Sequence, residues 1–461
     1  MKHSLFIFLL QIVSVYCATA QAEFSLDQAI DYAIKSSNAM KAEVLNVMDA
    51  EARVQEVKSS GKPKLNLGVN YNYNFIRPIQ PTEDFISPAI FDILNQFVFQ
   101  QPIDPGPPET FEITFARKHT LAGYADFQAL LFDPVFLKGL KAAKVSVDLE
   151  RLQSKISERD IIIEVTKAYL GTLVAYENKT IIENNISVVE TMLHETTQIY
   201  KAGFAEQLDV TRLELSRDKL NMELENLTQL IEVSKNLVQF HMNYPFDKDI
   251  LLTDNLQSML DQIQLEDDLM LASELRYTDR PEYAVINKAI ELDQLDIERL
   301  GLRWPILRAN INIQESLQRD DLFDGAEPGF LPAGFIGLNL KYPLIDGREK
   351  KSKQERAKIR QELKELQRKD FEKGMELEVI NSMTAHRNAK KTLQNREDAV
   401  TTTESIYDIT QIKFREGVGS SVEISVAEND LYQAQAAYIS ALYDVVLTKT
   451  DLDIALGKLN N

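Results

Sequence analysis

The side chains in this sequence that could perform acid–base, nucleophilic or metal chemistry do not form a catalytic pattern. Apart from Cys17, which lies in an expected leader, the chain has no cysteine. It contains neither a glycine-rich phosphate loop nor a pair of histidines at metal-binding spacing. The histidines beyond the leader are scattered, at His119, His194, His241 and His386. We therefore expect no enzymatic activity, no cofactor and no metal ligand, and we expect His241 to be a packing or surface residue.

Two carboxylates occur in a recurring pattern instead. Asp209 follows Gly203, and Glu423 follows Gly417, in both cases after a long segment without proline. Each glycine stands where a residue with positive φ would end a helix. Ser420 and Glu423, three residues apart, form a capping-box pattern for the helix that begins next. The pattern predicts two sharp helix–turn–helix tips.

These tips belong to an internal duplication of the chain. Asp133 corresponds to Asp346 with an offset of 213 residues, and Gly203 corresponds to Gly417 with an offset of 214. The first copy carries extra residues in a proline-rich segment around 77–110, which we expect to be an outward loop. We divide the chain into a signal peptide (1–22), a first repeat (23–245), an acidic linker or equatorial segment (246–270) and a second repeat (271–461).

Composition limits the possible functions. The net charge of -19 argues against nonspecific binding of nucleic acid. An apolar run over residues 5–16, followed by small residues at 18–20, predicts a secretory signal peptide that also removes Cys17. After it there is no run of 18 or more apolar residues, so any membrane-spanning part must consist of strands.

Four short segments alternate between apolar and polar residues: 65–75, 121–131, 307–314 and 336–342. They predict two β-hairpins, over 65–131 and 306–343. Eleven alternating residues suit a transmembrane strand with an asparagine-rich wet face, although a half-buried soluble strand alternates in the same way. Four strands cannot close a barrel, and an open edge cannot face lipid. A membrane location therefore requires several chains, giving eight strands for two copies or twelve for three.

The segments between the strands predict very long helices. Proline is absent from 135–202 and from 348–416, and a helix of nearly seventy residues is on the order of 100 Å long. In the returning helix, small and apolar residues recur at alternating spacings of four and three, from Leu431 to Leu459. This period is typical of left-handed coiled coils. We expect helical hairpins with tips far from the strands.

The segment from Phe414 to Ile424, the duplication and the signal peptide together resemble the TolC-type outer-membrane efflux family, also called outer membrane factors. The resemblance implies an α+β membrane protein. Its long coiled-coil hairpins would form a periplasmic α-barrel, and its four strands would contribute to a twelve-stranded β-barrel shared in a homotrimer. It also implies a channel in the outer membrane, in contact with lipid, with its helical tunnel in the periplasm.

In function, the resemblance implies passive conduction of substrates in efflux or type I secretion. A periplasmic adaptor would join the channel to an inner-membrane pump of the RND or ABC type. The tip residues implied to contact the adaptor are Gly203, Phe204, Leu208, Asp209, Gly417, Val418, Gly419, Ser420, Val422 and Glu423. The strand residues implied to face lipid are Leu67, Val69, Tyr71, Ile311 and Leu338.

The resemblance also implies a gate or pore-lining role for Asp209 and Glu423. The family often has a second carboxylate one turn after the first, but this chain has Val426 there. A helix-capping role for Glu423 is the alternative. For the whole chain, the alternative hypothesis is a non-conducting periplasmic or surface coiled-coil protein. That hypothesis accounts for the helices, but not for strand pairs of membrane-spanning length with uncharged polar faces.

Overall fold

A computed structural model describes residues 22–77, 79–83, 86–98, 110–114, 116–270, 275–321 and 329–458. The expected signal peptide lies outside the described residues, apart from Ala22, and so does Leu459 of the coiled-coil pattern. The chain separates into two compact units. The first comprises Met1–Ala52, Lys144–Gln294 and Ala357–Asn461, and the second comprises Arg53–Ala143 and Leu295–Arg356.

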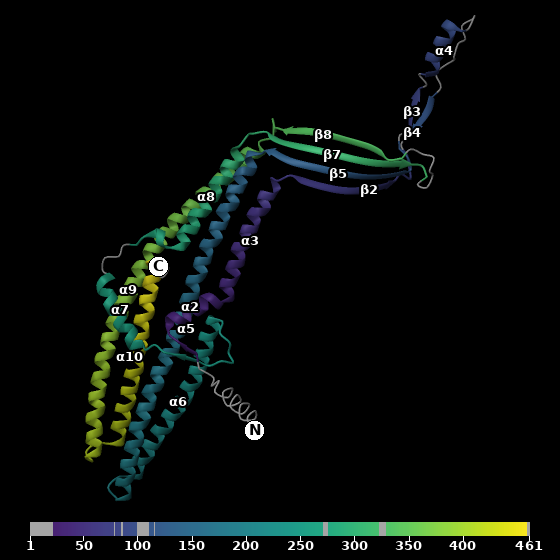
Figure 1. Ribbon diagram of the computed structural model, residues 1–461. Helices are drawn as coiled ribbons and strands as arrows, with labels where there is room; N and C mark the ends of the chain where they lie inside the picture. The colour runs from purple at the N-terminus through teal and green to yellow at the C-terminus, as the bar shows by residue number, and fades with distance from the viewer. Residues whose placement is uncertain are drawn as a thin grey trace, which may run out of the picture. The chain divides into compact units, whose positions relative to one another are not determined.

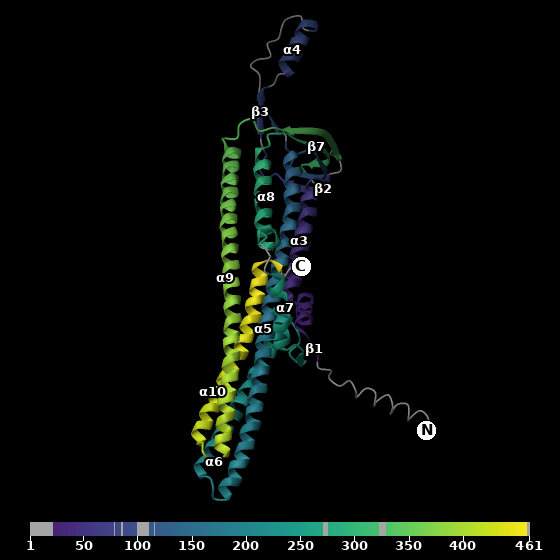
Figure 2. The ribbon, with the colours of Figure 1, turned by 90° about the vertical axis from the view of Figure 1, so that its left-hand side faces the viewer.

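Four long helices dominate the first unit. The outgoing helices are α5 (Pro134–Lys201) and α9 (Glu349–Arg415), and the returning helices are α6 (Gln207–Met242) and α10 (Ser421–Ala455). They run side by side in both views (Figures 1 and 2). The long helices predicted from the absence of proline are confirmed to within a residue or two at each end. Within the described part of the chain, none of the helices has both the length and the apolarity needed to cross a membrane.

The duplicated aspartates lie just before the outgoing helices. Asp133 Oδ1 accepts hydrogen bonds from the backbone N–H groups of Val135 (2.9 Å) and Phe136 (3.1 Å). Asp346 Oδ1 accepts one from the N–H of Arg348 (3.2 Å). The first N–H groups of a helix have no partner within the helix, and a short carboxylate supplies one. Only Asp133 therefore caps its long helix in this way, because Arg348 precedes α9 and has a φ of +69°.

The remaining elements of the first unit are short. They comprise α2 (Leu26–Ser36), α7 (Leu256–Met270), the 3-10 turn η1 (Tyr277–Asp279), and a two-stranded parallel sheet of β1 (Ala22–Phe24) and β6 (Ile250–Leu252). Helices α3 (Asn38–Ser60) and α8 (Pro281–Gly301) contribute residues to both units. The segment expected as an acidic linker, 246–270, contains β6 and α7. Its apolar residues Ile250, Leu256 and Leu260 are buried.

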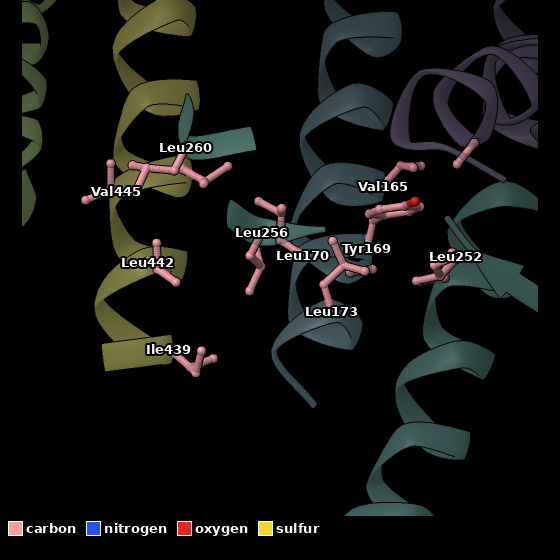
Figure 3. Packing of buried hydrophobic residues seen from close by; sticks show 14 of the residues in the cluster. Val165, Tyr169, Leu170, Leu173, Leu252, Leu256, Leu260, Ile439, Leu442 and Val445 are labelled. Carbon is pink, nitrogen blue, oxygen red and sulfur yellow. The ribbon is translucent and has the colours of Figure 1, made fainter. Parts of the chain in front are cut away.

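The main core of the first unit lies where α5, α7, β6 and α10 meet (Figure 3). Tyr169, Leu170 and Leu173 of α5 pack there with Leu256 of α7 and Leu442 of α10. Full burial of such a side chain contributes about 1.5–3 kcal/mol. On α10, every described residue of the predicted four-and-three pattern is buried or half-buried. The predicted coiled-coil face is therefore confirmed.

The second unit contains a four-stranded antiparallel sheet in the order β2-β5-β7-β8 (Figure 1). The strands are β2 (Lys64–Tyr73), β5 (His119–Phe132), β7 (Ile306–Arg319) and β8 (Leu331–Lys341). All four strands predicted from alternation are confirmed, and the β5–β7 pairing joins the hairpins of the two repeats. The ladder is regular except for one irregularity between Leu130 and Phe132.

The proline-rich insertion has more structure than the outward loop expected from the sequence. It contains α4 (Ile86–Phe97) between strands β3 (Ile79–Glu83) and β4 (Thr110–Thr114), which pair antiparallel. Ile90, Ile93 and Phe97 lie at helical spacing and are exposed. This spacing was the signal for the helix, but the surrounding prolines pointed to a loop.

Candidate functional site

Each helical tip turns at a glycine in the left-handed backbone region. Gly203 has φ of +85°, and Gly417 has φ of +76°. The N–H of Phe204 donates to the carbonyl of Ile199 (3.0 Å), and the N–H of Gly203 donates to the carbonyl of Tyr200 (2.9 Å). This Schellman pattern supplies partners for the last helical carbonyls, and the second copy repeats it. The predicted role of the two glycines is confirmed.

The returning helices start with capping bonds that differ between the copies. Ser420 Oγ accepts a hydrogen bond from the N–H of Glu423 (3.2 Å), as predicted. The reciprocal bond, in which the N–H of Ser420 would donate to the Glu423 carboxylate, is not formed in the described chain, and the Glu423 side chain is exposed. In the first copy, the N–H of Glu206 donates to Asp209 Oδ2 (3.3 Å). Asp209 is therefore engaged as a cap, whereas the Glu423 carboxylate extends into solvent.

The two tips meet and share a small cavity. The cavity has a volume of about 150 Å³, and its lining includes Phe204 and Asp209 from one tip and Gly417 and Gly419 from the other. Beside it, Arg415 Nε of α9 donates to a carboxylate oxygen of Glu195 of α5 (2.9 Å). The structure thus brings together four of the residues that sequence analysis assigned to the tips.

Apolar side chains are exposed at both tips. Phe204 is 86% exposed and Val418 is 79% exposed, and Leu208 and Val422 are also exposed. Beneath them lies a buried cluster that consists of Met192, Leu213, Tyr407, Ile424, Ala427 and Leu431. The cluster holds the turns in place while the apolar residues above it stay uncovered.

A larger cavity, which the sequence did not predict, lies along α6 and α10 and has a volume of about 720 Å³. Glu428, one of its lining residues, is only 9% exposed, and both of its carboxylate oxygens lie 2.9 Å from Ser216 Oγ. Burial raises the pKa of Glu428, while the hydrogen bond from Ser216 and the charge of Lys219 lower it. Glu428 lies three residues before Leu431 and outside the four-and-three pattern, where a charged side chain normally reaches solvent. The sequence therefore carries no signal for its burial.

No group of three or more potential metal ligands occurs among the residues that the structure describes. His241 Nδ1 lies 3.2 Å from a carboxylate oxygen of Glu164 on the neighbouring helix α5. This contact fits the packing or surface role expected for His241.

The sheet of the second unit separates the strand residues by face. Cross-strand partners point to the same side of a sheet, and the register pairs Leu67 with Ala125 and Ala125 with Ile313. The residues assigned to the lipid-facing side, Leu67, Val69, Tyr71, Ile311 and Leu338, all lie on this one apolar face. Leu67 is 77% exposed and Leu338 is 72% exposed. The opposite face carries Asn66, Asn70, Asn72, Asn310, Asn312 and Asn339.

Part of the chain matches a known protein family. Residues 309–458 match the family model described as outer membrane efflux protein. They cover most of the strands of the second repeat and all of its helical hairpin. A search of curated protein sequences finds no match.

Solved structures share the fold over nearly the whole chain. The outer membrane protein VceC from Vibrio cholerae is 17% identical, with a TM-score of 0.65 over 94% of this chain and 96% of that one. CusC, whose study concerns transmembrane channel formation, is 12% identical, with a TM-score of 0.69 over 94% and 91%. The Campylobacter jejuni CmeC outer membrane channel is 12% identical, with a TM-score of 0.66 over 94% and 85%. The match to the outer membrane efflux protein model is thus limited to residues 309–458, while the solved structures show that nearly the whole chain shares their fold.

Proposed function

We propose that three copies of this chain form a channel through the outer membrane that passively conducts substrates exported from the cell. The observation that carries this proposal is the four-stranded sheet. It has one apolar face and one asparagine-rich face, and its edge strands β2 and β8 each have a partner on one side only. Unpaired N–H and C=O groups at such edges are costly in lipid. Pairing β8 of each copy with β2 of the next would close a twelve-stranded barrel.

The helical hairpins of the first unit would continue this channel as a tunnel in the periplasm. Exposed Phe204 and Val418 at the tips support contact with a periplasmic adaptor, which would connect the tunnel to an inner-membrane pump of the RND or ABC type. Transport would then depend on the energy of the pump and on no chemistry in this chain. The similarity to solved outer membrane channels supports the same assignment.

At the tips, we assign the gating role to Glu423 and not to Asp209. The Asp209 carboxylate already caps its own helix, whereas the Glu423 carboxylate is exposed and makes no bond to that cap. Three Glu423 side chains around a threefold axis would narrow the tunnel and attract cations. Glu423→Gln should therefore change tip conductance more than Asp209→Asn, which should chiefly weaken the start of α6.

The alternative is a structural coiled-coil protein that does not conduct. The first test is native mass spectrometry of the detergent-extracted mature protein, followed by conductance in planar bilayers. We expect a trimer that requires detergent and opens ion-conducting channels. A monomer or dimer that is soluble without detergent would contradict the channel and favour the structural protein.

A matched pair of substitutions tests the face assignment. Leu67→Arg places a charge on the proposed lipid face, where it should cost about 2–4 kcal/mol near the middle of the bilayer. Asn70→Arg places the same charge on the polar face of the same strand and should leave trimer assembly largely intact. Trimer yield on native gels measures the difference. Equal losses from both substitutions would overturn the assignment of the two faces.

A further inference from the structure

The polar face of the sheet carries cations at the end where the strands join the long helices. Lys64 lies on β2, Arg308 on β7 and Lys341 on β8. The register places Lys64 opposite Gln128, and Arg308 opposite both Leu130 and Asn339, so these side chains share the asparagine-bearing face. Lys341 pairs with Ile306 and lies on the same face. The three cations therefore occupy three successive rows at one end of one face.

Little negative charge opposes them. Among the described residues of the four strands, Asp126 is the only carboxylate on the polar face, since Glu315 pairs with Gly123 and Pro332 on the other face. One oxygen of Asp126 already accepts a hydrogen bond from Gln128 Nε2 (2.7 Å). The face thus carries three cations and one carboxylate in each copy, in a chain whose overall net charge is -19.

Two of these cations surround a cavity. The cavity has a volume of about 160 Å³, and it is lined by Ser60, Lys62, Lys64, Gln128, Ala129, Leu130 and Arg308. Its volume equals that of about five water molecules, which leaves room for a carboxylate or phosphate group. Its polar lining offers ammonium, guanidinium, amide and hydroxyl donors, the groups that bind such anions.

The cations around the cavity are not neutralised by the protein. Within the described part of the chain, no carboxylate forms an ion pair with Lys62, Lys64 or Arg308. The positive charges of these side chains repel one another, and a bound anion would reduce that repulsion. If these cations were purely structural, we would expect carboxylates to pair with them. Asp320 pairs with Arg77 and Arg117 in this way at the other end of the strands.

We infer that the cluster of Lys62, Lys64, Arg308 and Lys341 is an anion-binding site that selects phosphate- or carboxylate-bearing solutes inside the channel. This inference rests on the proposed function, because only a closed trimer turns the polar face toward a pore. Three copies would then place twelve cations of the cluster and three Asp126 carboxylates around the pore. A lipid phosphate has the same chemistry, but the strand cations share a face with the asparagines and not with Leu67. A soluble anion is therefore the ligand we assign.

The test is the reversal potential of the mature protein in a planar bilayer of phosphatidylcholine, under a KCl gradient at low ionic strength. Low salt is needed because charges farther apart than about 10 Å are screened at 0.1 M. The Glu423 ring proposed at the tips would attract cations, so every channel in this test carries Glu423→Gln. In this background we expect a preference for chloride over potassium. The double variant Lys64→Gln/Arg308→Gln leaves only Lys62 and Lys341 of the cluster against Asp126, so the chloride-to-potassium permeability ratio should fall toward 1.

Two control variants sharpen the comparison. Asp126→Asn should increase the chloride preference, because it removes the opposing charge from the same face. Lys118→Gln removes an exposed lysine at the opposite end of β5, and it should shift the reversal potential by less than a third as much as the double variant. Inorganic phosphate should reduce the chloride current of the Glu423→Gln channel and leave that of the double variant unchanged.

The outcomes separate this inference from the proposed function. Conducting channels that prefer potassium, or a double variant with an unchanged reversal potential, would overturn the anion site and leave the channel intact. Complete absence of conductance would refute both. If the double variant fails to assemble, native mass spectrometry of the wild-type trimer decides. Retained inorganic phosphate supports the solute site, and retained anionic phospholipid alone overturns it.

Discussion

Replacing Gly417 with alanine tests the geometry of the tips directly. Its φ of +76° lies in the left-handed region, where an L residue with a Cβ costs about 1–2 kcal/mol. A Cβ built at Gly417 meets nothing within 4 Å, so the whole cost comes from the backbone. The preceding helix supplies a matched control in Gly374, which lies in the interior of α9, is exposed, and also has open space around a built Cβ. Gly374→Ala should stabilise the helix by about 0.5–1 kcal/mol.

Both substitutions replace glycine with alanine, one inside α9 and one just after its end. Their effects on stability should therefore have opposite signs and differ by about 1.5–3 kcal/mol. Amide hydrogen exchange measures this difference locally, because helix ends open without global unfolding. Exchange of residues 413–420 should become about 5–30 times faster in Gly417→Ala. Around residue 374 it should become slower in Gly374→Ala.

Gly417→Asn adds an internal check. Asparagine tolerates the left-handed conformation better than alanine does, so exchange at the tip should increase less. If Gly417→Ala leaves the exchange of residues 413–420 unchanged, or if both alanine variants shift exchange in the same direction, then positive φ is not what holds the turn. The interpretation of the duplicated glycines would then be wrong.

Two further predictions concern buried polar groups of the first unit. Tyr169→Phe removes two hydrogen bonds of the hydroxyl. It donates one to the Phe24 carbonyl (2.8 Å), which still accepts the N–H of Thr253, and it accepts one from the N–H of Asp254 (3.4 Å). Urea unfolding should show a free energy of unfolding that is lower by about 1–3 kcal/mol, and the exposed Tyr200→Phe should show no loss. Because burial raises the pKa of Glu428, the folded protein binds this proton more tightly than the unfolded chain, and stability falls as pH rises from the ordinary glutamate pKa through the raised one. Thermal unfolding across that range should depend less on pH in Glu428→Gln, and an unchanged slope would contradict the prediction.

The sequence by itself determined the elements, because their signals are local. Absence of proline predicted α5 and α9 almost to the residue, since proline is the strongest barrier to helix continuation. Period-two alternation predicted β2, β5, β7 and β8, and the duplicated glycines predicted both turns. In the proline-rich insertion the same reasoning failed. There prolines outweighed the short helical pattern of α4, which needs only three turns to form.

Only the tertiary structure decided which distant groups meet. Alternation places a residue on a face, but register across strands is needed to bring Lys64 and Arg308 to one cavity. The β5–β7 pairing joins residues about 190 positions apart, and no local pattern specifies it. The burial of Glu428 likewise depends on α6, which supplies Ser216 across the helix pair. Local physics therefore set the helices, strands and turns, while long-range packing set the charges and cavities through which they act.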